Sequence, residues 1–147
     1  MIAIACDHGG YKLKLAIEKY FEDKRITYRD FGTDNENSCD YADFAKKVAY
    51  SVKSGESDFG ILVCGTGIGM SLAANKVKGI RAAVCSDYFS AKYTRLHNDA
   101  NILCLGQRVV GEGLALELVD VFLNTSFEGG RHADRIAKIA DIENENI

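Results

Sequence analysis

A thiol followed by alternating glycines marks the segment Cys64–Gly69, whose sequence is CGTGIG. The segment follows an apolar run, Phe59–Cys64, that has the length of a buried strand, and it precedes a helical pattern. Unpaired amides and the helix dipole favour anions at such a helix N-terminus, and the same field favours the thiolate form of a cysteine. Gly65, Gly67 and Gly69 allow backbone amides to approach a ligand closely. The pattern predicts an anion-binding loop beside a reactive thiol; the alternative is a glycine-rich turn that only packs.

Three better-known loop motifs do not fit this segment. A dinucleotide-binding fingerprint has a third glycine where Met70 stands, and a P-loop ends in Gly-Lys-Ser or Gly-Lys-Thr, which is missing here. The phosphate-clamping arginine of a cysteine phosphatase loop is also missing, because Met70 and Ser71 occupy that part of the segment. These three assignments are therefore disfavoured.

Asp7 and His8 follow another apolar run of strand length, Met1–Cys6. The carboxyl ends of parallel strands meet at one edge of a sheet, so both side chains are expected near the Cys64–Gly69 loop. There Asp7 can accept hydrogen bonds from sugar hydroxyls, and His8 can donate one to phosphate. The alternative is an aspartate that caps a helix next to a surface histidine.

Arg131 and Arg135 open the last predicted helix, directly after Gly129 and Gly130. Their spacing places both guanidinium groups on one helix face, where two planar forks suit a phosphate. The alternative is a solvated basic face. Cations are disfavoured at a helix N-terminus by the dipole, so their presence there favours an anionic partner.

His97 and Asn98 end another predicted helix. His97 is either a cation at a helix C-terminus or a general acid and base that works near neutral pH, and the spacing does not decide between them. The three histidines, His8, His97 and His132, are far apart in sequence and lack the spacing of metal ligands. No metal site is therefore predicted.

Short apolar runs alternate with amphipathic ones throughout the 147 residues. Strands are predicted at Met1–Cys6, Ile26–Phe31, Phe59–Cys64, Ile80–Cys85 and Asn101–Leu105, with helices between them and two further helices at the end. This order predicts one α/β domain over residues 1–147, a Rossmann-like α/β/α sandwich with a five-stranded parallel sheet. The ligand-binding loops are then expected at Asp7–Gly10, Gly65–Gly69 and Ser86–Asp87, which follow three of the strands.

Composition narrows the classes of function. A formal net charge of −3 argues against a nucleic-acid binder. There is no signal-peptide pattern, and no apolar run has the length of a membrane helix. Five cysteines without paired spacing favour a reducing compartment, so a cytoplasmic protein is predicted.

Six segments together resemble the B-type ribose-5-phosphate isomerases, a family that includes the subunits of galactose-6-phosphate isomerase. They occur in the family's order and cover essentially the whole chain: CDHGGYKLK at Cys6–Lys14, DFGT at Asp30–Thr33, CGTGIGMSLAANK at Cys64–Lys76, GIRAAVC at Gly79–Cys85, HNDANIL at His97–Leu103 and FEGGRHADRI at Phe127–Ile136. The resemblance implies interconversion of ribose 5-phosphate and ribulose 5-phosphate in the pentose phosphate pathway, without a cofactor.

The resemblance also implies roles for individual residues. Cys64 corresponds to the base that moves a proton between C2 and C1 through a cis-enediolate, while Thr66 and the amides of Gly65–Gly69 stabilise the oxyanion. His97 corresponds to the acid and base that opens the sugar ring, assisted by Asp7. The other positions that are expected to bind substrate are His8, Tyr41, Asn98, Arg108, Arg131 and Arg135.

Two departures and two alternatives accompany these expectations. The family's usual proline after the tyrosine is Ala42 here, and Gly69, Met70 and Ser71 offer no carboxylate base of the kind that some members use. The family implies a homodimer, or a dimer of dimers, with shared active sites. The alternative functions are an isomerase of hexose 6-phosphates and a non-catalytic sensor of sugar phosphates or nucleotides, which would need the arginines but no base.

Overall fold

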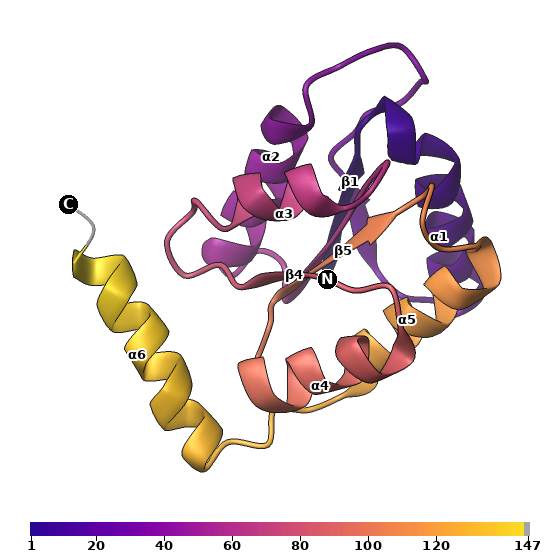
Figure 1. Cartoon of the computed structure of the whole chain (residues 1–147). Helices are drawn as coiled ribbons and strands as arrows, with labels where there is room; N and C mark the ends of the chain where they lie inside the picture. The colour runs from indigo at the N-terminus through magenta and orange to yellow at the C-terminus, as the bar shows by residue number, and fades with distance from the viewer. Residues whose placement is uncertain (146–147) are drawn as a thin grey trace.

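Five parallel strands form the central sheet of this protein (Figure 1). The computed structural model describes residues 1–145. The strands are β1 (Ile2–Cys6), β2 (Tyr28–Asp30), β3 (Phe59–Cys64), β4 (Ala82–Val84) and β5 (Ile102–Gly106). Their order across the sheet is β2-β1-β3-β5-β4. The predicted α/β/α sandwich is confirmed; the last two residues of the predicted domain lie outside the described part.

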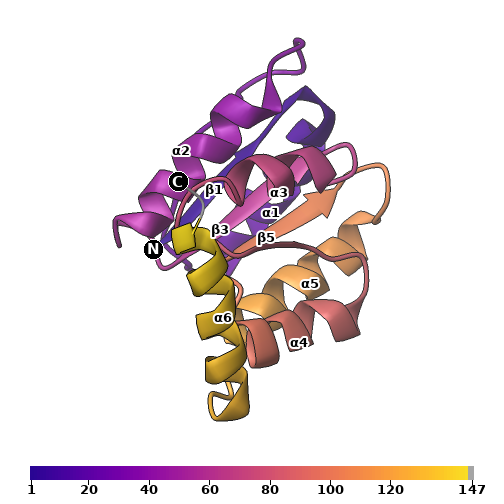
Figure 2. The same cartoon turned by 60° about the vertical axis from the view of Figure 1, so that its left-hand side comes forward.

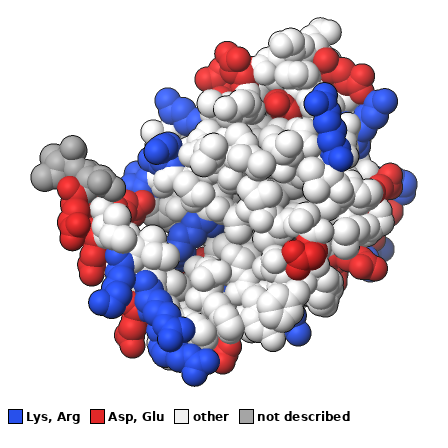
Figure 3. Space-filling view, in the orientation of Figure 1, with Lys and Arg blue, Asp and Glu red and all other residues white. Residues whose placement is uncertain are grey.

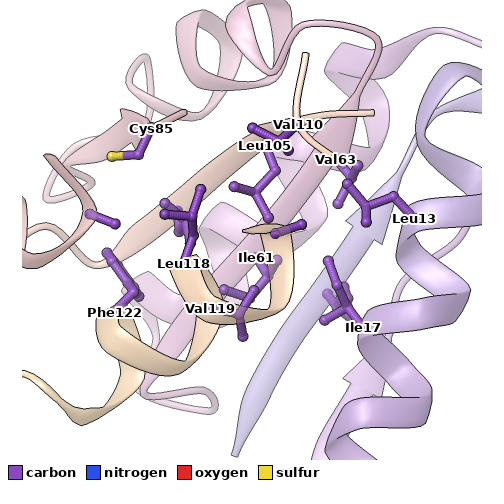
Figure 4. Close-up of a cluster of buried hydrophobic side chains, with 14 of the residues drawn as sticks. Leu13, Ile17, Ile61, Val63, Cys85, Leu105, Val110, Leu118, Val119 and Phe122 are labelled. Carbon is purple, nitrogen blue, oxygen red and sulfur yellow. The ribbon is translucent and has the colours of Figure 1, made fainter. Parts of the chain in front are cut away.

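Helices cover both faces of the sheet. The 3-10 turn η1 (His8–Gly10) leads into α1, and the helices are α1 (Tyr11–Asp23), α2 (Tyr41–Lys53), α3 (Ile68–Ala74), α4 (Tyr88–Asn98), α5 (Glu112–Asn124) and α6 (Arg131–Glu145). Apolar side chains of α1, α4 and α5 form one core with the sheet, part of which Figure 4 shows. The helices α2 and α3 form a second core on the other face.

The alternation along β3 directs each of its side chains to one of these cores. Ile61 and Val63 belong to the core beneath α1 and α5, whereas Leu62 and Cys64 belong to the core beneath α2 and α3. Side chains of a strand point alternately to opposite faces, so this register fixes the side of the sheet on which the Cys64 thiol lies. That side is the one where the following helix, α3, begins.

The edge strands are shorter than the sequence predicts. The runs Ile26–Phe31 and Ile80–Cys85 contain only the three-residue strands β2 and β4. Each of these strands pairs with a single neighbour, β2 with β1 and β4 with β5. An edge strand has fewer ladder partners to extend it, whereas the central strand β3 has the predicted bounds.

The last helix projects from the rest of the domain. Figures 1 and 2 show α6 standing beside the end of α4, away from the sheet. The turn into α6 uses Gly129 and Gly130, whose φ angles of 71° and 58° favour glycine. None of the helices within residues 1–145 combines the length and the apolar character needed to cross a membrane.

Candidate active site

The loops after β1 and β3 meet at the carboxyl edge of the sheet. The chain places β2 on one side of β1 and β3 on the other, so the gap between β1 and β3 is the switch point at which such sheets bind ligands. The backbone amide of Asp7 donates to the carbonyl of Val63 at 3.1 Å. A Cβ atom on Gly10 would lie 2.4 Å from that same carbonyl oxygen. Glycine is therefore required where these two loops touch.

Cys64 ends β3 and is buried, with 5% of its surface exposed. The backbone amide of Gly67 donates to its sulfur at 3.0 Å. Gly67 is the N-cap of α3 and has a φ of 80°, and a Cβ there would lie 3.0 Å from the backbone of Leu105. A larger residue would be strained in this conformation and crowded by Leu105, so the amide that faces the thiol depends on glycine.

The remaining cysteines are poor candidates for a base. Burial raises the pKa of Cys6 to about 12 and that of Cys85 to about 11, and it raises the pKa of the fully buried Cys104 well above its usual value. These three thiols therefore keep their protons at neutral pH and belong to the two cores. Cys39 is half-buried in the polar loop before α2.

His8 has its hydrogen bonding set by the same polar loop. The amide of Cys39 donates to Nδ1 of His8 at 3.2 Å, so this nitrogen is an acceptor. In a neutral imidazole the proton then lies on Nε2, which can donate to a ligand oxygen. Asp7 caps η1 by accepting a hydrogen bond from the Gly9 amide at 2.8 Å, and its role toward substrate stays a prediction.

Tyr41 and Arg108 lie on either side of the glycine loop. The ring of Tyr41 occupies the space beside Gly69, where an added Cβ would lie 2.8 Å from the ring. The side chain of Arg108 lies over Gly65, with Cδ 3.6 Å from the position of a Cβ, and its amide donates to the Gly65 carbonyl at 3.0 Å. Among residues 1–145 the Arg108 side chain makes no ion pair, which leaves its guanidinium available to an anion.

Arg108 belongs to a loop that the sequence did not place among the three predicted ones. The loop packed against Gly65 follows β5, because β5 lies between β3 and β4. The ligand-binding role of Ser86–Asp87 stays a prediction. Asp87 instead caps α4 by accepting a hydrogen bond from the Ser90 amide at 2.7 Å. Strand order, which the linear sequence does not state, decided which loop adjoins Cys64.

A second group of predicted residues lies at the other end of the domain. The helix α4 runs back from the carboxyl end of β4 toward the amino end of β5, so His97 and Asn98 at its end are remote from the Cys64 loop (Figure 1). Arg131 and Arg135 are exposed on the first turns of α6, beside them. Within residues 1–145 no hydrogen bond or ion pair joins this group to the Cys64 loop.

The structure brings together two histidines that are distant in sequence. The rings of His97 and His132 stack with centroids 4.0 Å apart and planes 11° from parallel. Glu128 joins them, and one ligand atom from each residue lies within 4.8 Å of the others. The argument that the histidines are too far apart to bind a metal together is therefore corrected for this pair. Parallel rings nevertheless direct their in-plane lone pairs side by side, not toward one ion, so this arrangement does not favour a metal.

Comparison with known proteins shows the family of this chain. Residues 2–139 match the family model described as Ribose/Galactose Isomerase. The chain belongs to the ribose/galactose isomerase family. Ribose-5-phosphate isomerase B of Escherichia coli, a member by name, is 48% identical over 142 residues, which cover 97% of this chain and 95% of that protein.

Solved structures of similar isomerases share the whole fold. Ribose-5-phosphate isomerase B of Clostridium thermocellum is 55% identical with a TM-score of 0.98, and the match covers 99% of each chain. The corresponding Mycoplasma genitalium enzyme, solved with bound ribulose 5-phosphate, is 44% identical with a TM-score of 0.94, covering 99% of this chain and 97% of that one. Membership of this family identifies the chain as an isomerase, and the alternative of a non-catalytic sensor is set aside.

Proposed function

We propose that this isomerase interconverts ribose 5-phosphate and ribulose 5-phosphate through a cis-enediolate, with Cys64 as the base. The observation that carries the proposal is the position of the Cys64 thiol. It lies at the end of β3, directly before the glycine loop, and accepts a hydrogen bond from the Gly67 amide. The complex of a similar enzyme with ribulose 5-phosphate supports a pentose phosphate as substrate. Conversion of ribose 5-phosphate to the ketose by the purified protein is the direct test.

The proposed proton transfer moves protons and electrons only between Cys64 and the sugar, so it needs no cofactor. The Cys64 thiolate removes the hydrogen from C2 of the open-chain aldose, and the electrons of that bond form the C1–C2 double bond while O1 becomes negative. Amides of Gly65–Gly69 and the Thr66 hydroxyl stabilise that charge, as an oxyanion hole does. The thiol then returns the proton to C1, the hydroxyl proton moves from O2 to O1, and the carbonyl is left at C2.

A hexose 6-phosphate is the alternative substrate. The same base, Cys64, and the same proposed phosphate-binding arginines, Arg131 and Arg135, would serve a sugar with one more carbon. Discrimination between two substrates that differ by about one methylene is worth only about 1–3 kcal/mol. Turnover of ribose 5-phosphate, allose 6-phosphate and galactose 6-phosphate should therefore be compared on one preparation. A higher kcat/KM for either hexose phosphate would reassign the substrate and leave the proposed proton transfer intact.

The active unit is proposed to be a homodimer, alone or paired into a dimer of dimers, in which the second group completes the partner's site. In one chain His97, Asn98, Arg131 and Arg135 are remote from Cys64, so each Cys64 loop lacks the proposed acid and base of ring opening and the two arginines. Figure 3 shows that the face over α3, β4 and α4 is largely free of charged side chains. Leu72 of α3, Phe89 of α4 and Ile142 of α6 are each exposed at 60% or more. Apolar surface of this kind is typical of an interface, and a second copy is the occupant that would complete the site.

Arg131 and Arg135 are proposed to bind the phosphate. Replacing either with alanine is expected to raise KM about 10- to 100-fold while kcat changes much less, because a charge-assisted hydrogen bond contributes about 1.5–3 kcal/mol and phosphate takes no part in the proton transfer. Steady-state kinetics with ribose 5-phosphate measure this split. A loss of thermal stability with unchanged KM would instead make the arginines structural.

The reaction is proposed to need no metal or other cofactor, because backbone amides and Thr66 supply the stabilisation of the enediolate. Exhaustive dialysis against a chelator is expected to leave kcat unchanged, as measured in metal-free buffer. Loss of activity that a divalent ion restores would contradict the proposal.

Location in the cytoplasm remains a prediction, based on five cysteines that are free thiols.

A further inference from the structure

The ring of His97 is held on two sides. His132 stacks on one face, and the ring of Tyr93 meets His97 edge-on, with centroids 4.9 Å apart and planes at 80°. The backbone fixes the same region, because the Glu128 amide donates to the Leu96 carbonyl at 3.0 Å and the His132 amide to the Gly129 carbonyl at 3.2 Å. The orientation of a side chain that is about one-third exposed is thus set by its neighbours.

His132 has a feature that packing does not explain. Its ring is buried, and among the described residues its Nε2 has no hydrogen-bond partner. A buried polar atom without a partner is unfavourable, and an apolar aromatic ring could stack on His97 without that cost. The nitrogen therefore requires a reason beyond the shape of the ring.

The atom that both histidines face is one carboxylate oxygen. Oε2 of Glu128 lies 3.5 Å from Nε2 of His97 and 3.9 Å from Nε2 of His132. Parallel stacking places the two Nε2 atoms on the same side, where a carboxylate oxygen can accept from both. A small movement of the exposed Glu128 side chain would bring either distance into hydrogen-bonding range.

The groups around the two histidines favour the neutral form of His132. Burial lowers the pKa of His132, the nearby His97, Arg131 and Arg135 lower it further, and only Glu128 opposes them. His132 is therefore neutral at pH 7, and its face does not repel a positive charge on His97. The groups that contact His97 are then Tyr93 from its own helix, the carboxylate of Glu128 and the neutral His132.

We infer that His132 and Glu128 are positioning residues for the sugar-ring opening: neutral His132 anchors the Glu128 carboxylate, which orients His97 and balances the proton that it carries. The inference rests on the proposed role of His97. In that step His97 takes the proton of the anomeric hydroxyl, the bond between C1 and the ring oxygen breaks, C1 becomes an aldehyde, and His97 gives the proton to the ring oxygen.

Two substrates separate this role from a structural one. Ribose 5-phosphate is bound as a closed ring, whereas ribulose 5-phosphate has its 5-hydroxyl phosphorylated and stays open. Both His132→Phe, which keeps a stacked aromatic ring but removes the nitrogens, and Glu128→Gln are expected to lower kcat for the aldose about tenfold, at the low end of general acid–base effects. Exchange of solvent deuterium into C1 of the ketose needs no ring closure and should stay within about twofold of the unmodified rate, with unchanged thermal unfolding.

The double variant tests whether the two residues act as one unit. Its loss with the aldose is expected to equal that of the worse single variant, since residues of one network are not additive. Equal losses with both substrates, additive losses, or no loss would overturn the inference. His97→Ala is the reference: if its own loss is not selective for the aldose, the proposed role of His97 fails, and that failure is visible without either of the other variants.

Discussion

Cys64→Ala is expected to lower kcat and kcat/KM together by about 10²–10⁴-fold, the range that a positioned general base contributes. The other buried thiols cannot replace it, because burial raises the pKa of Cys6, Cys85 and Cys104 and keeps them protonated. Binding of the phosphate should persist, because Arg131 and Arg135 are unchanged. Steady-state kinetics, together with incorporation of solvent deuterium at C2 of the aldose, measure the loss of proton transfer.

Cys39→Ala is the matched control, because Cys39 is the least buried of the other thiols and has no proposed role in proton transfer. Its activity should be nearly that of the unmodified protein. A Cys64→Ala variant that kept full turnover would show that the base lies elsewhere, and Asp7 would be examined next. Chemical modification alone would not decide the question, because an accessible Cys39 would react as well.

Mixing Cys64→Ala with His97→Ala is expected to restore activity toward ribose 5-phosphate from two inactive proteins. If each site combines the Cys64 loop of one chain with His97 of the other, a mixed dimer contains one intact site and one that lacks both residues. Random exchange makes half of the dimers mixed, so turnover per chain should reach about a quarter of that of the unmodified protein. Activity followed during subunit exchange gives this fraction.

A second mixture shows whether the recovery has the proposed origin. Asp7 lies on the same side of the site as Cys64, so Cys64→Ala mixed with Asp7→Ala should gain nothing. Recovery in this mixture, or none in the first after exchange is confirmed by mass, would rule out sites shared in the proposed way. The pair of mixtures thus separates the two groups of residues without a structure of the complex.

The sequence predicted most reliably what local pattern determines. The bounds of β3 were predicted correctly because a central strand is apolar on both faces and ends at a glycine loop. The short edge strands β2 and β4 were overestimated, since their apolar runs continue past the point where a ladder partner exists.

Features that depend on strand order or on distant packing were not predictable in this way. Arg108 reaches the loop through the position of β5 in the sheet, and its role was suggested only by resemblance. The stacking of His97 on His132 joins α4 to α6 across the Gly129–Gly130 turn. Its one local signal was the i, i+4 spacing of Glu128 and His132, which the two glycines interrupt.

In the proposed dimer, the projecting helix α6 makes catalysis depend on protein concentration. If one chain lends Arg131 and Arg135 to the site of another, the free energy of phosphate binding also holds the two chains together. Ligand that binds only the assembled form shifts the association equilibrium by mass action, so substrate promotes assembly and dilution opposes it. The sugar phosphate is then both the reactant and a ligand that stabilises the dimer, and in this proposal an isolated folded chain contains no complete active site.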